Sequence, residues 1–219
     1  MPASSIPYLS PVEARVLGVL AEKQRTVPDT YPLTLNALVS GCNQKTSRDP
    51  VMEVSDAQAQ EAVDSLKSMN LVVESSGGRV ARYTHNTERV LQVPSPSVAL
   101  LAVLMLRGPQ TAGELRINCD RLHKFADISA VEGFLHELAG RPAGALVTEL
   151  ARQPGSRENR WAHLLSGTPA QEQHSPSPQP VSRTDEHEEL AALRARVAAL
   201  EAEMSELREQ VAALKTGRQ

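Results

Sequence analysis

A repeated pattern of residues constrains the fold of this chain more than any other feature. Thr34, Leu38 and Cys42 are matched at one constant offset by residues of the same types, namely Thr111, Leu115 and Cys119. Each set lies between two longer apolar helix patterns, and two short apolar segments follow. The order helix, helix, helix, strand, loop, strand therefore occurs twice. It predicts a mainly α chain with small β-hairpins, organised as two tandem winged-helix domains.

Polar residues that can cap helix N-termini mark where these helices start. Ser10 and Glu13 form a capping box with Pro11 at the first helical position. Thr34 and Ser55 are placed to cap the next two helices. The second repeat carries two further predicted capping boxes, Thr111 with Glu114 and Ser129 with Glu132. Helices that start at matching places in both repeats support an architecture of two similar domains.

Short apolar segments after each third helix predict the hairpins. Residues 71–74 and 80–85 are expected to pair across a glycine-bearing turn. Residues 146–150 and 160–165 are expected to pair across a longer loop in the second repeat. The predicted organisation is a disordered N-terminus (1–9), winged-helix domain 1 (10–93), winged-helix domain 2 (94–167), a disordered Pro/Ser/Gln linker (168–184) and a coiled coil (185–216).

The C-terminal helix carries a heptad pattern that predicts a partner. Its core positions are Leu190, Leu193, Val197, Leu200, Met204, Leu207, Val211 and Leu214. Leucine at every d position and two β-branched residues among the a positions favour two parallel strands. In that arrangement the flanking charges attract and none repel. We expect a parallel homodimer; the alternative is an Ala- and Glu-rich helix that folds back on its own domains or stays partly helical alone.

Composition narrows the class of protein. The 219 residues carry a formal net charge of only −3, which argues against a histone-like binder of nucleic acid. No apolar run approaches the roughly 20 residues that span a bilayer, and the N-terminus does not resemble a signal peptide, so we expect a cytoplasmic protein without a membrane contact. Cys42 and Cys119 occupy equivalent places and are expected to be buried thiols.

Catalytic motifs are missing from the sequence. We find no phosphate-binding glycine loop, nucleophile elbow or histidine pair at zinc spacing, and we expect no enzymatic activity, cofactor or metal. Cys119 and His123, four positions apart, form a weak candidate pair for a metal. A buried thiol beside an exposed imidazole explains them more simply.

A winged helix usually inserts its third helix into the major groove of DNA. The predicted third helices of this chain carry negative charge, which opposes that mode of binding. Asp56, Glu61 and Asp64 outweigh Lys67 in the first repeat, and the corresponding helix of the second is also acidic. Positive charge collects on the hairpins and polar loops instead. The candidate nucleic-acid-binding residues are Lys45, Arg48, Arg79, Arg82, Arg116, Arg121, Arg152, Arg157 and Arg160. Such arginines can also form an ordinary solvated surface.

Two functions therefore stay open. The first is a dimeric DNA-binding protein, such as a transcription regulator, that contacts DNA through its wings and the polar segment 43–50. The second is a protein–protein adaptor whose acidic third helices form the interface, without DNA binding.

Motifs in both repeats resemble the YceH-like family of uncharacterised bacterial proteins. The resemblance spans residues 10–167 and rests on Glu22-Lys23-Gln24, Tyr31-Pro32-Leu33, Asn36-Ala37-Leu38, Cys42-Asn43-Gln44-Lys45, Arg48 with Pro50-Val51, Leu106-Arg107-Gly108-Pro109-Gln110-Thr111, Gly113-Glu114-Leu115-Arg116 and Pro154-Gly155 with Arg157-Glu158. It implies tandem winged-helix domains with a link to DNA or regulation, and no catalytic residues. Asn118 and Trp161 depart from the family pattern, which has an arginine and a tyrosine there.

Overall fold

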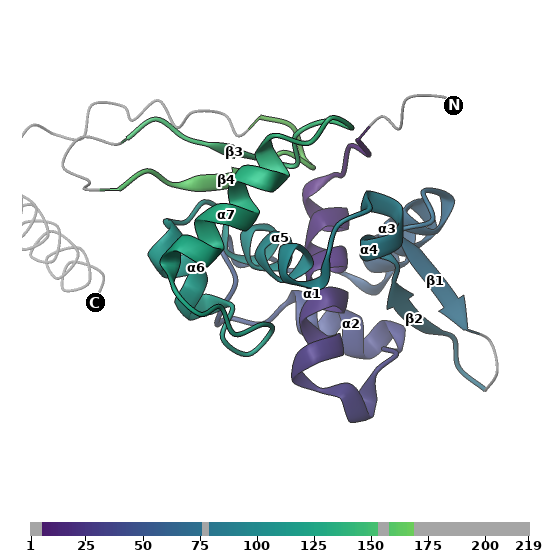
Figure 1. Cartoon of the computed structure of the whole chain (residues 1–219). Coiled ribbons are helices and arrows are strands. Elements are labelled where there is room, and N and C mark those ends of the chain that lie inside the picture. Colours follow the sequence, from purple (N-terminus) through teal and green to yellow (C-terminus); the bar gives the residue numbers. More distant parts are fainter. Residues whose placement is uncertain (1–5, 76–78, 153–157, 169–219) are drawn as a thin grey trace, which may run out of the picture. The chain divides into compact units, whose positions relative to one another are not determined.

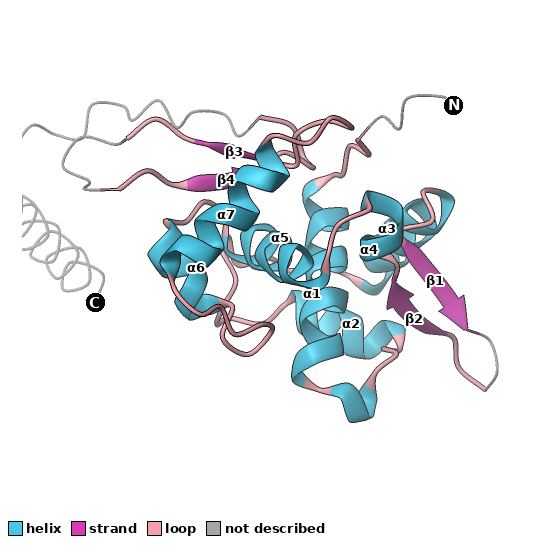
Figure 2. Cartoon of the chain, viewed as in Figure 1, coloured by secondary structure: helices cyan, strands magenta, loops and turns pink. Residues whose placement is uncertain are grey.

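The computed structural model describes residues 6–75, 79–152 and 158–168 (Figure 1). The first repeat contains α1 (Pro11–Thr26), η1 (Pro28–Thr30), α2 (Leu35–Cys42), α3 (Asp56–Ser68), β1 (Val72–Ser75), β2 (Arg82–His85) and α4 (Thr87–Leu91). The second contains α5 (Ser95–Arg107), α6 (Ala112–Asn118), α7 (Ile128–Ala139), β3 (Val147–Glu149) and β4 (Trp161–His163). The mainly helical chain with two small antiparallel strand pairs is as predicted (Figure 2). The coiled coil with its eight core positions and the linker from residue 169 onward lie outside the described residues.

Helix starts follow the predicted caps with one exception. The capping boxes at Ser10 and Thr111 form, and Ser55 forms a further one with Gln58. The predicted box of Ser129 with Glu132 is wrong, because Asp127 caps α7 instead. Its Oδ1 accepts a hydrogen bond of 2.8 Å from the Ala130 amide, so the helix begins before Ser129. The short α4 and η1 were not predicted.

Each hairpin is completed by one residue from the segment that precedes the second helix of its repeat. Leu33 exchanges both backbone hydrogen bonds with Tyr83 of β2, at 3.1 and 2.8 Å. Gln110 exchanges the same pair with Trp161 of β4, at 3.0 and 2.7 Å. The two repeats therefore fold their backbones in the same way. β1 has the predicted length but begins one residue later, and the other three strands are shorter than the apolar segments that predicted them.

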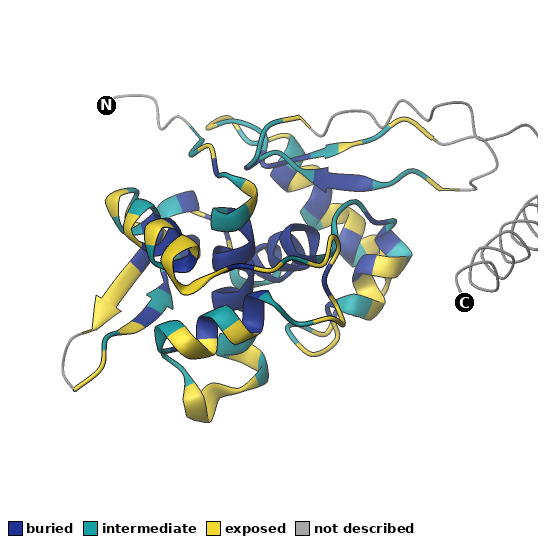
Figure 3. Cartoon of the chain, turned by 180° about the vertical axis from the view of Figure 1, so that it is seen from behind, coloured by how far each residue is buried: buried dark blue, intermediate teal, exposed yellow. Residues whose placement is uncertain are grey.

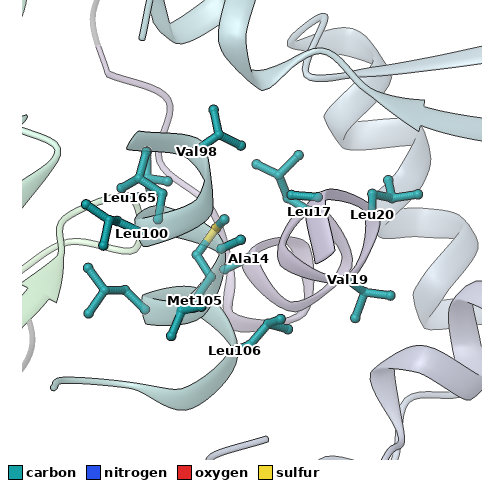
Figure 4. Close-up of a cluster of buried hydrophobic side chains, with 14 of the residues drawn as sticks. Ala14, Leu17, Val19, Leu20, Val98, Leu100, Met105, Leu106 and Leu165 are labelled. Atoms are coloured by element: carbon teal, nitrogen blue, oxygen red, sulfur yellow. The ribbon is translucent and has the colours of Figure 1, made fainter. Parts of the chain in front are cut away.

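The packing of α1 against α5 joins the repeats around one hydrophobic core. Gly18 permits the close approach of these helices, because a Cβ atom there would lie only 3.0 Å from the Leu106 side chain. Figure 4 shows residues of both repeats, such as Leu17 and Leu100, gathered in the same cluster. α5 is buried on every side from Ser97 to Leu106 (Figure 3). The described residues belong to one compact unit, with Cys42 and Cys119 both buried in it as free thiols.

No helix in the described ranges is both long and apolar enough to cross a membrane.

A buried histidine ties the first hairpin to α1. His85 Nε2 lies 2.8 Å from Gln24 Oε1, and Nδ1 lies 3.2 Å from Thr87 Oγ1. Burial is the main cause that lowers the pKa of His85 from 6.5 to about 4, and the charge of Arg25 lowers it further. The folded protein therefore holds this imidazole in its neutral form.

This lowered pKa predicts a loss of stability in mild acid. As the pH falls below 6.5, the unfolded chain binds a proton at His85 and the folded chain does not until about pH 4, so stability is lost across this window. Between about pH 7.5 and about pH 5, the free energy of unfolding should fall by about 2 kcal/mol more in the wild type than in His85→Gln. Urea titrations at both pH values measure this. An equal decrease in the free energy of unfolding of the wild type and His85→Gln would contradict the lowered pKa of His85.

The glycines of α2 and α7 predict opposite effects of one substitution. A Cβ atom at Gly41 would lie 2.6 Å from Val19 Cγ1, whereas one at exposed Gly133 meets nothing within 4 Å. Gly41→Ala should lower the free energy of unfolding by about 1 to 3 kcal/mol through overpacking. Gly133→Ala should raise it by about 0.5 to 1 kcal/mol, because alanine favours the helix. Urea unfolding followed by circular dichroism compares them, and a Gly41→Ala variant as stable as the wild type would refute the packing of α2 on α1.

Candidate nucleic-acid interface

The predicted cationic residues fall into three groups. Those that are exposed are Lys45, Arg79, Arg82, Arg116, Arg121 and Arg152. Arg160 is half-buried, and Arg48 is buried. Arg157 lies outside the described residues. The exposed group is the one that can meet a phosphate backbone without unfolding the chain.

Arg48 differs from the expectation that it contacts nucleic acid. Its side chain is fully buried, with Nη2 2.7 Å from Glu22 Oε2. Nε donates to the Gly41 carbonyl at 3.1 Å, and Nη1 donates to the Ser47 carbonyl at 2.8 Å. A guanidinium with these partners cannot reach a phosphate. Arg48 instead holds the polar segment 43–50 against α1 and α2.

A second buried arginine holds the same segment. Arg15 of α1 is 2% exposed and donates to the Pro50 carbonyl at 2.6 Å and to the Cys42 carbonyl at 3.3 Å. Burial lowers the pKa of this guanidinium, but arginine titrates so far above neutral pH that the side chain stays charged. Two arginines thus fix the path of the chain from α2 toward α3.

The two hairpins offer less free positive charge than the sequence indicates. Arg82 donates to the Pro32 carbonyl at 2.8 Å, which engages it with its own repeat. Arg152 lines a hollow of about 380 Å³ beside the second hairpin, together with Glu132, Glu149 and Glu158. The charges around this hollow sum to a negative value. The described part of the second hairpin is therefore a poor site for a phosphate.

A positively charged surface lies where the two repeats meet. We call it the inter-repeat groove: a hollow of about 70 Å³ lined by Glu22, Thr26, Ser47, Arg48, Val103, Leu106, Arg107, Asn118, Arg121 and Leu122. Within the part of the chain that the structure describes, Glu22 pairs with Arg48 and Lys23, and no ion pair forms at Arg107 or Arg121. Arg107 and Arg121 thus leave an excess of positive charge here.

Hydrogen bonds set the geometry of this groove. The Asp49 amide donates to the Leu106 carbonyl at 2.8 Å, which joins the polar segment to the last turn of α5. Arg107 Nη2 donates to Ser47 Oγ at 2.7 Å across the joint. Gly108, with φ of 71°, ends α5 there in a conformation that favours glycine. Hydrogen bonds between the two repeats therefore fix the position of Arg107.

Sequence reasoning did not select Arg107 as a candidate. The residue ends a run of buried α5 residues, where a basic side chain is expected to satisfy the helix C-terminus. Only the packing of one repeat on the other brings it beside Ser47 and Arg121. One sequence signal could have identified Arg107: it is a basic residue in the last turn of an otherwise buried helix, next to the boundary between the repeats.

The third helices are acidic on their exposed faces. In α3, Asp56, Glu61 and Asp64 are exposed, and Lys67 is engaged with Asp64 and Glu74. In α7, Glu132 and Glu137 are exposed. These helices would repel phosphate, so a nucleic acid must approach other surfaces of this unit.

Substitutions of Arg48 and Lys45 should change the free energy of unfolding by very different amounts, although both residues lie in the polar segment. Among the described residues, Arg48→Ala leaves the partly buried Glu22 carboxylate with Lys23 alone and the Gly41 carbonyl without its donor, and it should lower the free energy of unfolding by about 3 kcal/mol. Lys45→Ala, on an exposed side chain, should change it by less than about 0.5 kcal/mol. Chemical denaturation checks both. Similar small effects of both variants would mean that Arg48 is not buried as described.

Comparisons with known proteins place this chain among bacterial relatives. Residues 9–156 match the family model described as protein of unknown function, DUF480. The UPF0502 protein of Dechloromonas aromatica is 62% identical over 206 residues, which cover 94% of this chain and 95% of the relative. That of Burkholderia thailandensis is 56% identical over 207 residues, covering 93% and 86%. That of Cupriavidus necator is 68% identical over 159 residues, which cover 73% of this chain and 65% of that longer relative.

Proposed function

This chain belongs to the DUF480 family of proteins of unknown function, and we propose that it is a non-enzymatic DNA-binding protein built from two winged-helix domains. The observation that carries the proposal is the excess positive charge of the inter-repeat groove. We further propose that the protein acts in transcription regulation as a parallel homodimer, paired through the heptads of residues 185–216.

The backbone of each repeat supports the winged-helix interpretation. Three helices precede a two-stranded hairpin in both repeats, which is the element order of this fold. The backbone pairing of Leu33 with Tyr83, and of Gln110 with Trp161, extends each hairpin at the same place. Such a domain presents helices and a wing to DNA.

The chemistry of the groove suits a phosphate group. Arginine donates several hydrogen bonds in a planar fork that matches phosphate oxygens, so Arg107 and Arg121 can each bind one bidentately. Ser47 and Asn118 add a hydroxyl and an amide, which commonly contact the DNA backbone. Contacts of this kind position a protein on a duplex without reading its sequence.

Exposed cations also lie beyond the groove, on α6 and the segment that follows it. Arg116 and Lys124 are exposed there, together with the acidic residues Glu114 and Asp120. In this proposal α6, the second helix of its repeat, faces the DNA backbone in place of the acidic α7. Two protomers would present two such surfaces and gain affinity through their linkage.

A protein–protein adaptor is the second candidate function. The acidic face of α3 favours it, because Lys67 is engaged by neighbouring carboxylates and leaves Asp56 and Glu61 without a basic residue in α3 to offset them. Such a face suits a basic partner surface, and this function requires no DNA.

Neutralising the groove separates these functions. Binding of a labelled duplex of mixed sequence is measured by fluorescence anisotropy over a range of salt concentrations. Arg107→Gln with Arg121→Gln should weaken binding and make the slope of log affinity against log salt shallower by about 2. Arg89→Gln, an exposed cation of α4 that does not line the groove, should leave the slope unchanged.

Circular dichroism of each variant confirms that the fold is retained. If the wild type shows no duplex binding at low salt, the DNA-binding proposal fails and the adaptor remains. If the wild type binds and the double variant keeps the same slope, DNA is bound by another surface and the groove is excluded.

A further inference from the structure

The segment that precedes α1 lies on the second repeat. The Leu9 amide donates a hydrogen bond of 2.7 Å to the Leu165 carbonyl, and the Leu9 side chain is fully buried. Figure 1 shows this segment beside the loops that follow α7 and β4. We call residues 6–9 the strap. It joins the N-terminal end of α1, which belongs to the first repeat, to the segment after β4 of the second.

Two glycines of the second repeat let the strap approach closely. A Cβ atom at Gly144 would lie only 2.6 Å from Ile6 Cδ1, and one at Gly167 would lie 3.2 Å from Tyr8 Cε2. A side chain at Gly144 would therefore displace the strap. The fit shows that the strap has a defined seat on the second repeat.

Few interactions hold the strap in this seat. Among the described residues, the bond from Leu9 to Leu165 is the only backbone hydrogen bond between the strap and the second repeat. The Tyr8 side chain is 73% exposed, and Ile6 is half-buried. A segment with so few buried contacts opens at a smaller free energy than the helical core does. The strap can therefore open while the rest of the unit stays folded.

α1 carries the strap at one end and part of the inter-repeat groove at the other. The groove residues Glu22 and Thr26 lie in its last two turns, about 15 to 25 Å along the helix from its first residue. Between the two ends, Gly18 packs against Leu106 of α5. A helix is a rigid element that can carry coupling between distant sites, so a shift of its N-terminal end also moves its groove residues.

A second backbone hydrogen bond joins the repeats at the groove. There the Asp49 amide donates to the Leu106 carbonyl at 2.8 Å. Arg15 of α1 holds the neighbouring Pro50 carbonyl, and Glu22 of α1 pairs with Arg48. The segment that contains Asp49 therefore moves with α1, and its amide reports whether the groove is intact.

We propose that the strap regulates the inter-repeat groove. When it is closed, it holds α1 in the position that brings Ser47 to Arg107 across the groove. When it opens, α1 shifts on α5 and the hydrogen bonds at the groove loosen. The consequence for DNA, which is weaker binding when the strap is open, rests on the proposed function. The coupling of strap and groove does not.

Native-state hydrogen exchange of the full chain, followed by NMR, tests the coupling without DNA. Ile6→Gly removes the contact with Gly144 and should speed exchange of the Leu9 and Asp49 amides by about three- to tenfold. The Leu71 amide, which donates to the Leu66 carbonyl within the first repeat, should keep its rate.

Val80→Gly is the matched control, because it removes an exposed aliphatic side chain that lies far from α1 in the sequence. It should leave the exchange of the Leu9 and Asp49 amides unchanged. If Ile6→Gly speeds Leu9 alone, or neither amide, the strap does not act on the groove and the proposal fails. Equal acceleration of Leu71 would also overturn it, because the variant would then weaken the whole unit.

The effect on DNA is measured separately, by anisotropy with a labelled duplex of mixed sequence. Ile6→Gly should weaken binding by about threefold or more, and saturating duplex should in turn slow exchange of the Leu9 amide in the wild type. If the wild type binds no duplex, the proposed function fails while the exchange rates still decide the coupling. If it binds and Ile6→Gly binds as tightly, the strap does not regulate DNA binding.

Discussion

The packing of α1 against α5 is the contact on which the rest of the structure depends. A unit of roughly 75 to 85 residues buries little surface by itself and is near the small end for a stable core. Here each repeat contributes its first helix to one shared core, which α5 enters with all of its middle residues buried. Gly18 lets the two backbones come close enough for this core to be continuous. Neither hairpin contributes as much to this hydrophobic core as α1 and α5 do.

The same packing creates the surface proposed to bind DNA. It brings the polar segment of the first repeat to the end of α5, where the Asp49 amide meets the Leu106 carbonyl. Buried Arg15 and Arg48 fix the polar segment from beneath, and the exposed Arg121 and half-buried Arg107 face the groove. Arginine therefore has two roles where the repeats meet. The buried arginines hold the backbone in place, and those that face the groove are available to a phosphate.

Much of this fold could be predicted from the sequence, because local chemistry determines its elements. Capping residues such as Ser10 and Thr111 located helix starts, and apolar segments located both hairpins. The start of α7 was misjudged because Asp127, two residues before Ser129, is the N-cap residue and accepts the hydrogen bond of the Ala130 amide. The winged-helix domains and the coiled coil stay predictions.

The candidate site was less accessible to sequence reasoning. Arg48 in a polar loop has the pattern of a solvent-facing cation, and its burial depends on partners in two helices, Glu22 of α1 and the Gly41 carbonyl of α2. The groove itself depends on residues from two repeats, whose relative placement is a consequence of long-range packing. No local pattern encodes that placement.

Packing of α1 against α5 makes the two repeats one cooperative folding unit. Trp161 is the single tryptophan of the chain and lies in the second repeat, so its fluorescence reports unfolding of that repeat alone. Far-UV circular dichroism reports the helices of both. A urea titration followed by both signals should give coincident transitions with one midpoint. A fluorescence transition separated from a second dichroism transition would show that the repeats unfold independently, and would contradict the account.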